Sequence, residues 1–279
     1  MPTPFDHLAL AEEILNQRGL SGPVRDGLLA ARPAFLLGNT APDFGTICGI
    51  PRARTHFFEM PMEDRRPAHL RLLSAFPELR QPHRLDRERA AFVAGYLLHL
   101  WLDQAWIATI FEPIFGPTVA RQTFAQRLID HNLLRAYLDQ NNRERLPNDI
   151  HHALQGASPE AWLPFAPDNE LRRWRDLLVD QVTPGGNSQT VAVFAERLGV
   201  PASDFATRLA SSDEMQQAVF RYLPLRRLAA FRRYSLGRSI ELLTAYWTGR
   251  LDSASSVNCP FRRKAVLMVL PAEGLYESH

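Results

Sequence analysis

Hydrophobic residues recur along this chain mostly at the three- and four-residue spacing of α-helices. This periodicity predicts helices over residues 5–18, 24–31, 68–79, 119–142, 169–182, 190–198 and 201–210, and a long helix over 212–247 that Pro224 could interrupt. The glycines and prolines between residues 35 and 54 predict a loop. No useful stretch alternates with a period of two, and only the apolar run 265–270 has strand character. The expected fold class is therefore all-α.

The chain is expected to form a single mostly helical domain over residues 1–279. Its 279 residues would suffice for one large domain or two ordinary ones, but no clear linker divides them. The motifs that carry chemistry lie within residues 1–110. A helical extension is expected from about residue 160 to residue 279.

The longest apolar segment runs from Ala90 to Phe115 and predicts a buried helix that begins near Asp86. A transmembrane helix needs about 20 consecutive apolar residues, whereas this segment contains His99 and Asp103. An ionisable pair is costly in lipid. A buried helix that carries a functional site fits better, and no transmembrane segment is expected.

Residues four apart lie on one face of a helix, so His99 and Asp103 would direct an imidazole and a carboxylate at one point. The residues around them are apolar, and an unpaired buried carboxylate is expensive. A metal ion would satisfy both groups. A hydrogen-bonded His–Asp pair inside the core is the alternative, and this pattern alone leaves both open.

Three further residues are candidates for the same chemistry. Asp43 follows Pro42 in the predicted loop, where a carboxylate can be aimed at a ligand. His56 lies between Thr55 and hydrophobic residues, and His7 lies near the start of the first predicted helix. Taken singly, Asp43 could be an ordinary turn or capping residue, and each histidine could be a satisfied core residue.

Together, these residues resemble the metal ligands of the zinc-dependent phospholipase C family, which is related to the P1-type nucleases. The resemblance covers roughly the first 110 residues. It rests on the order of four segments: Phe5-Asp-His7-Leu-Ala, Gly38-Asn-Thr-Ala-Pro-Asp43, Thr55-His56-Phe and Gly95-Tyr-Leu-Leu-His99-Leu-Trp-Leu-Asp103. It implies a multi-helix phospholipase C/P1 nuclease-like domain with a metal cluster in its core.

The resemblance also implies a division of the ligands. Asp43, His56, His99 and Asp103 would form one metal site, and Asp103 would bridge toward a second ion at His7. Imidazole and carboxylate ligands suit Zn²⁺, although ligand type alone leaves Fe, Mn and Ni open.

One departure from the family pattern bears on the number of ions. The full three-metal site of the family also uses a His-x3-Glu pair, and no such pair follows Asp103 here. His131 is the only histidine in the next predicted helix, and the residue four positions later is Arg135. His131 is therefore a possible additional ligand, with a core or surface role as the alternative. We expect one or two ions.

The activity that the resemblance implies is metal-assisted hydrolysis of a phosphodiester or phospholipid-like substrate. Asp43 would be the catalytic carboxylate that orients or deprotonates the attacking water. Arg52 or Arg54 could neutralise phosphate charge, or both could be solvated loop residues. Because the His-x3-Glu pair is missing, a catalytically inactive metal-binding scaffold or interaction module is the alternative.

Composition and the first residues bear on the protein's partners, disulfides and location. The chain has 32 basic and 30 acidic residues, a net charge of +2, so bulk charge gives no specific nucleic-acid signal. The arginines at 226–238 could form a membrane-surface face or a solvated stripe. The two cysteines, Cys48 and Cys259, form no CxxC motif and no disulfide framework. The first residues lack the basic and apolar regions of a signal peptide, so a cytoplasmic location is expected. The sequence carries no signal for oligomeric state.

Overall fold

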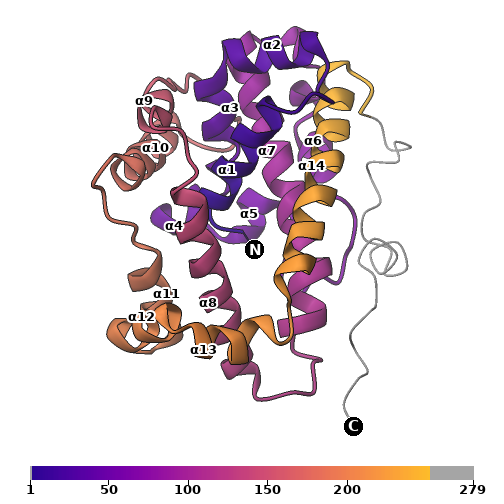
Figure 1. Ribbon diagram of the computed structural model, residues 1–279. Coiled ribbons are helices and arrows are strands. Elements are labelled where there is room, and N and C mark those ends of the chain that lie inside the picture. The colour runs from indigo at the N-terminus through magenta and orange to yellow at the C-terminus, as the bar shows by residue number, and fades with distance from the viewer. Residues whose placement is uncertain (1, 252–279) are drawn as a thin grey trace.

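The computed structural model describes residues 2–251, and within that range it contains helices and no strand (Figure 1). The prediction of an all-α fold is confirmed. The strand-like run 265–270 lies outside the described residues. The α-helices are α1 (Pro4–Leu15), α2 (Gly22–Ala30), α3 (Arg32–Gly38), α4 (Gly45–Cys48), α5 (Arg52–His56), α6 (Ala68–Ala75), α7 (Arg87–Trp106), α8 (Phe124–Arg143), α9 (Ile150–Gln155), α10 (Asp168–Val182), α11 (Thr190–Leu198), α12 (Ala202–Ala210), α13 (Ser212–Met215) and α14 (Leu225–Trp247).

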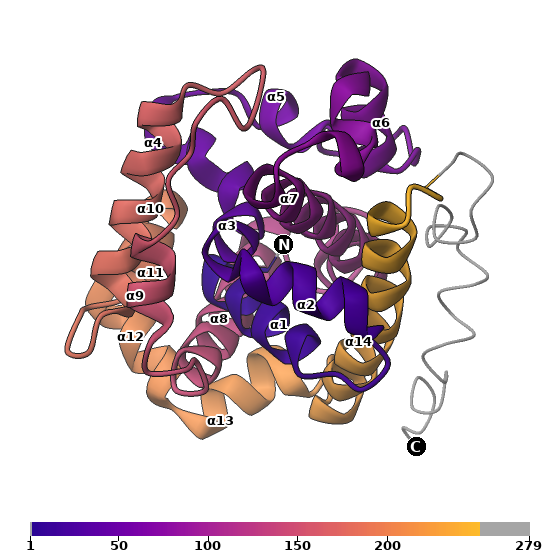
Figure 2. The ribbon, with the colours of Figure 1, turned by 90° about the horizontal axis from the view of Figure 1, so that it is seen from above.

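Helix α7 is the centre of the molecule, as the apolar segment predicts. Every residue from Ala90 to Trp106 is buried. The helix begins at the N-cap Asp86, whose carboxylate accepts a hydrogen bond from the Arg89 backbone N–H at 2.8 Å. Helices α3, α6 and α14 pack against α7, and α1 contacts α3, α8 and α14 (Figure 2). This arrangement keeps water away from the polar side chains on α7.

Two glycines let α3 and α7 approach backbone to backbone. A Cβ atom at Gly38 would lie 2.1 Å from the Phe92 carbonyl oxygen, and one at Gly95 would lie 2.4 Å from the Phe35 carbonyl oxygen. Any larger residue would push the two helices apart. The contact holds the segment after α3 directly against the middle of α7.

The loop predicted for residues 35–54 is wrong. The structure has α3, a 3-10 turn at Ala41–Phe44, α4 and α5 there. Pro33 and Pro42 occupy the first turn of their helices, where a missing N–H breaks no hydrogen bond. Gly49 ends α4 in the left-handed conformation with a φ of 66°. These residues therefore separate short helices from one another.

Prolines and capping residues set the other helix boundaries. The helix predicted over 68–79 stops at Ala75 because Pro77 follows, and α8 begins after the N-cap Thr123. The long helix predicted over 212–247 is divided at Pro224. Its first part is α13, capped by Ser211, followed by a π-helical turn at Gln216–Phe220.

One cluster of buried hydrophobic side chains extends from Leu8 to Leu251 and includes residues from both halves of the chain. Two arginines of the stripe on α14 form ion pairs, Arg232 with Glu13 and Arg238 with Glu241. None of the helices in residues 2–251 combines the length and the apolar character needed to cross a membrane.

Candidate metal centre

The five predicted ligands come from four separate elements and meet at one point beside α7. His7 lies on the second turn of α1, Asp43 lies in the 3-10 turn at Ala41–Phe44, and His56 is the last residue of α5. His99 and Asp103 lie one turn apart on α7. The structure therefore brings together all the residues that the sequence patterns single out, except His131.

Asp103 is at the middle of the cluster. Its Oδ1 atom lies 3.5 Å from the Nε2 atom of His7, and its Oδ2 atom lies 3.5 Å from the Nε2 atoms of both His56 and His99. The Asp43 Oδ1 atom lies 3.3 Å from His56 Nε2. The two sides of the Asp103 carboxylate thus face different histidines, which is the geometry of a bridging ligand.

The imidazoles also contact one another directly. The rings of His7 and His99 stack with their centroids 3.8 Å apart, and the Nε2 atoms of His56 and His99 are 3.3 Å apart. Ligand atoms of His7, His99 and Asp103 all lie within 4.8 Å of one another, as do those of Asp43, His56 and His99. These two groups share His99 and could each hold a metal ion.

Hydrogen bonds on the outer side fix two of the imidazoles. His99 Nδ1 lies 2.8 Å from the Asn39 carbonyl oxygen and donates to it, so that in the neutral imidazole the Nε2 lone pair is left for a metal ion. His56 Nδ1 lies 2.9 Å from the Thr55 hydroxyl oxygen. The Tyr96 hydroxyl donates to the Thr55 carbonyl oxygen at 2.6 Å and ties α5 to α7. Outer partners of this kind orient metal-binding histidines.

Buried polar atoms without partners show that the donor set suits a cation. His7 Nε2 and Asp103 Oδ1 are buried, and neither has a hydrogen-bond partner among residues 2–251. Their residues are at most 1% exposed. Buried polar groups are normally paired, and a metal ion would pair both atoms at once. Nitrogen and carboxylate donors in this combination are zinc ligands.

A family model described as zinc dependent phospholipase C matches residues 6–166, which is more than half of the chain. This chain belongs to the zinc-dependent phospholipase C family. The match includes all five residues of the cluster, and the family's name indicates zinc dependence. A search of curated proteins and a search of solved structures found no match.

Burial sets the protonation of the histidines in this family member. It lowers the pKa of His7 to about 4, with a contribution from neighbouring His99. It also lowers the pKa of His56 to about 4, with a contribution from the Arg52 charge. For His99, burial acts in the same direction, but the Asp103 carboxylate outweighs it and raises the pKa above the usual value. His7 and His56 are therefore neutral at pH 7, which is the form that binds metal.

The carboxylates stay ionised in spite of burial. Burial alone would raise the pKa of Asp103, but the charges of His99 and Arg52 hold it well below its usual range. Burial is also outweighed at Asp43, whose pKa is lowered by a hydrogen bond from His56 and by the charge of His99. Both groups thus offer negative charge to a cation at neutral pH.

Two arginines add positive charge around the cluster. The Arg52 guanidinium donates to Asp103 Oδ2 and lies 3.8 Å from Asp43 Oδ1. Arg135 on α8 is half-buried. Burial lowers its pKa to about 10, and the Asp43 and Asp103 carboxylates oppose that shift. Arg135 therefore adds a second positive charge that interacts with the cluster's carboxylates.

The possible additional ligand His131 lies elsewhere. Its Nε2 atom accepts a hydrogen bond from the Trp106 indole at 3.0 Å, and its ring packs against Phe111 and Phe115. It belongs to neither of the two groups that could hold an ion. The geometry thus gives His131 the core role that the sequence left open as the alternative.

Sequence reasoning did not find the outer partners of the cluster. Asn39 contributes a backbone carbonyl, which leaves no side-chain signature in the sequence. Thr55 could have been noticed as the hydroxyl next to His56. Arg135 stands four residues after His131, where the family's His-x3-Glu pair would place a glutamate. Nothing in the sequence of α8 indicates that Arg135 is close to Asp43 and Asp103.

Proposed function

We propose that this protein is a metal-dependent phosphodiester hydrolase that acts on a phospholipid-like substrate. The observation that carries the proposal is the convergence of His7, Asp43, His56, His99 and Asp103 in one buried cluster. Family membership supports the same activity. A cytoplasmic location is part of the proposal.

The arrangement supports one or two zinc ions. His99, Asp103 and His7 would hold one ion, and His56, His99 and Asp43 would hold the other, with Asp103 facing both. Because His99 appears in both groups, its single free Nε2 atom limits how many ions have a full ligand set. Fe, Mn or Ni could bind the same donors.

When bound, zinc polarises a phosphoryl oxygen and lowers the pKa of a coordinated water molecule. The protein's own contribution begins at Asp43, whose side chain is 17% exposed and is the most accessible of the five ligands. Its lowered pKa makes it a weak base. Asp43 therefore orients the attacking water through a hydrogen bond, and we favour this role over proton abstraction.

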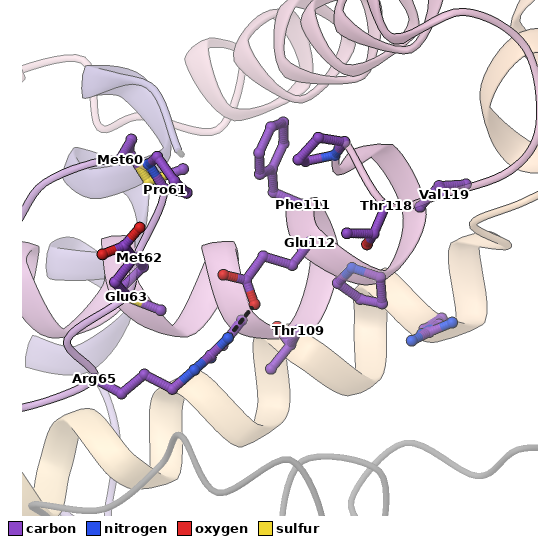
Figure 3. Close-up of a pocket in the computed structure, with 14 residues that line it drawn as sticks. Met60, Pro61, Met62, Glu63, Arg65, Thr109, Phe111, Glu112, Thr118 and Val119 are labelled. Atoms are coloured by element: carbon purple, nitrogen blue, oxygen red, sulfur yellow. Dashed lines mark hydrogen bonds and ion pairs between the residues drawn. The ribbon is translucent and has the colours of Figure 1, made fainter.

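The structure also has a pocket whose lining includes none of the five cluster residues. It has a volume of about 560 Å³, and its walls include Met60, Met62, Phe111 and Val119 (Figure 3). The lining also includes the charged side chains of Glu63, Arg65, Glu112 and Arg227, and Arg65 pairs with Glu112 at 2.8 Å. The pocket's apolar walls would suit the apolar part of a phospholipid-like molecule.

Hydrolysis of bis(p-nitrophenyl) phosphate tests the activity. We expect turnover that is lost on chelation and restored by added zinc. The variants His99→Ala and Asp103→Ala should be inactive, whereas His83→Ala, which changes an exposed histidine, should retain full activity. Turnover that survives chelation and both cluster substitutions would rule out the mechanism.

The second candidate is a binding module that keeps the metal site but has no turnover. The hydrogen bond that ties His131 to Trp106 favours it, because it removes the one histidine that could supply a further ligand from α8. Zinc-loaded protein would then bind metal but hydrolyse none of a panel of phospholipids, nucleotides and single-stranded DNA. Metal-dependent turnover of any of these would reject the binding module.

A further inference from the structure

The Arg52 guanidinium lies between the cluster's carboxylates and the solvent. It donates to Asp103 Oδ2 and lies 3.8 Å from Asp43 Oδ1. The Arg52 side chain is 29% exposed, whereas that of Asp103 is 1% exposed. His7, His56 and His99 are likewise buried. A molecule that enters from solvent therefore meets Arg52 and Asp43 before it meets the other members of the cluster.

Helix α5 fixes the position of the Arg52 guanidinium. Arg52 is the first residue of α5 and His56 is the last, so the two lie four apart and share one face of the helix. The guanidinium carbon lies 5.2 Å from the centroid of the Phe58 ring, a distance at which a cation is attracted to an aromatic face. Helix α5 thus carries both a metal ligand and a positive charge toward the same point.

The charge of Arg52 works against metal binding. A divalent cation held by Asp43 and Asp103 has to share these carboxylates with the guanidinium, and the two positive groups repel each other. A positive side chain at this position is an advantage only if it binds something negative beside the metal.

A phosphodiester offers the matching chemistry. Its single negative charge is spread over two non-bridging oxygens, and a guanidinium can donate two parallel hydrogen bonds to such a pair. Arg52 has a donor to spare, because its Nη1 atom lies 3.8 Å from Asp43 Oδ1, which is beyond hydrogen-bond distance. Arg54 differs: it lies on the same short helix but is exposed, and no ion pair joins it to the cluster in the described part of the chain.

We propose that Arg52 is the phosphate-binding residue of this site and pairs with a non-bridging phosphoryl oxygen on the solvent side of the metal cluster. The inference rests on the proposed phosphodiester hydrolysis. It assigns two opposite effects to one side chain. Arg52 weakens the binding of the cation and strengthens the binding of the phosphate.

The test compares Arg52→Gln with the matched control Arg54→Gln. Zinc affinity is measured by competition with a chromophoric chelator, and the binding of inorganic phosphate to zinc-loaded protein by calorimetry. Arg52→Gln should bind zinc about tenfold more tightly and phosphate about ten- to a hundredfold more weakly. Arg54→Gln should match the wild type in both measurements.

Either of two results for Arg52→Gln would overturn the inference: unchanged phosphate affinity, or weaker zinc binding, which would mean that the guanidinium holds the carboxylates in place. If this variant does not fold, Arg52→Lys provides the test. Lysine keeps the charge but loses the paired donors, so phosphate binding should weaken, and an unchanged affinity would contradict the proposal. Neither binding measurement needs turnover. Phosphate binding that depends on Arg52 without hydrolysis would therefore reject the proposed function alone.

Discussion

Replacing Gly95 with alanine tests whether the α3–α7 contact holds the metal centre together. The new Cβ atom would lie 2.4 Å from the Phe35 carbonyl oxygen and 2.8 Å from the Asn39 backbone nitrogen, closer than the 3.0 Å that real contacts keep. Overpacking of this kind costs about 1–3 kcal/mol. The better helix propensity of alanine returns about 0.5–1 kcal/mol. We expect a net loss of about 0–2.5 kcal/mol in the free energy of unfolding, whereas a residue with open space around it would gain stability.

The same contact positions His99, because the bond from its Nδ1 atom to the Asn39 carbonyl oxygen crosses from α7 to the end of α3. Separation of the two helices would lengthen that bond. Losing an outer partner of a metal-binding histidine typically costs about 10- to 100-fold in metal affinity. Gly95→Ala should therefore weaken zinc binding as well as stability.

Gly237→Ala is the matched control. Gly237 also lies within a long helix, α14, but apart from its own turn of backbone no heavy atom of the described residues lies within 4 Å of the Cβ position. Alanine there should stabilise the protein by about 0.5–1 kcal/mol. Urea unfolding followed by circular dichroism gives both values, and chelator competition gives zinc affinity. A Gly95→Ala variant as stable as Gly237→Ala, with unchanged zinc affinity, would show that the α3–α7 contact does not hold the metal centre together.

Three further predictions concern protonation, ligands and metal removal. Burial raises the pKa of Asp139 to about 7 from a usual value of 3.8, so the native state keeps a proton that the unfolded chain loses. Stability should fall as pH rises from about 4 to 7, by at most about 4 kcal/mol. Asp139→Asn should flatten that fall in urea titrations, unlike the exposed Asp176→Asn. His99→Ala should weaken zinc binding more than about 100-fold; His131→Ala should leave it unchanged, and equal losses in both would contradict the assigned ligands. At a free zinc concentration 100 times the Kd, bound zinc should stabilise the protein by about 2.7 kcal/mol, and chelation should remove that stabilisation. A melting temperature that does not respond to chelator would argue against a specific site.

The central helix and its ligand pair could be predicted because the relevant information is local. His99 and Asp103 are four residues apart in a segment that is apolar on all sides, and helix geometry alone places them together. The position of His7 and Asp43 beside this pair depends on the tertiary structure, because they lie on other elements. Only the family resemblance, which fixes the order of the motifs, predicted it.

The segment over residues 35–54 shows why the rest could not be predicted. Its prolines and glycines are typical of loops, yet they lie at helix starts and ends where they break no hydrogen bond. Because the sequence does not reveal α5, it does not show that Arg52 and His56, four residues apart, share one face of a helix. Arg52 and Arg54 therefore remained equivalent candidates in the sequence, and only the structure separates them.

Anomalous diffraction at the zinc edge, from crystals of the zinc-loaded protein, would show directly whether the five residues hold a metal ion. We expect one or two strong peaks inside the cluster, with His56, His99 and Asp43 at zinc–ligand distances of about 2.0–2.2 Å and Asp103 facing the same metal. Zinc found only outside this cluster in saturated crystals, with His99 and Asp103 still contacting each other and no metal, would contradict this expectation.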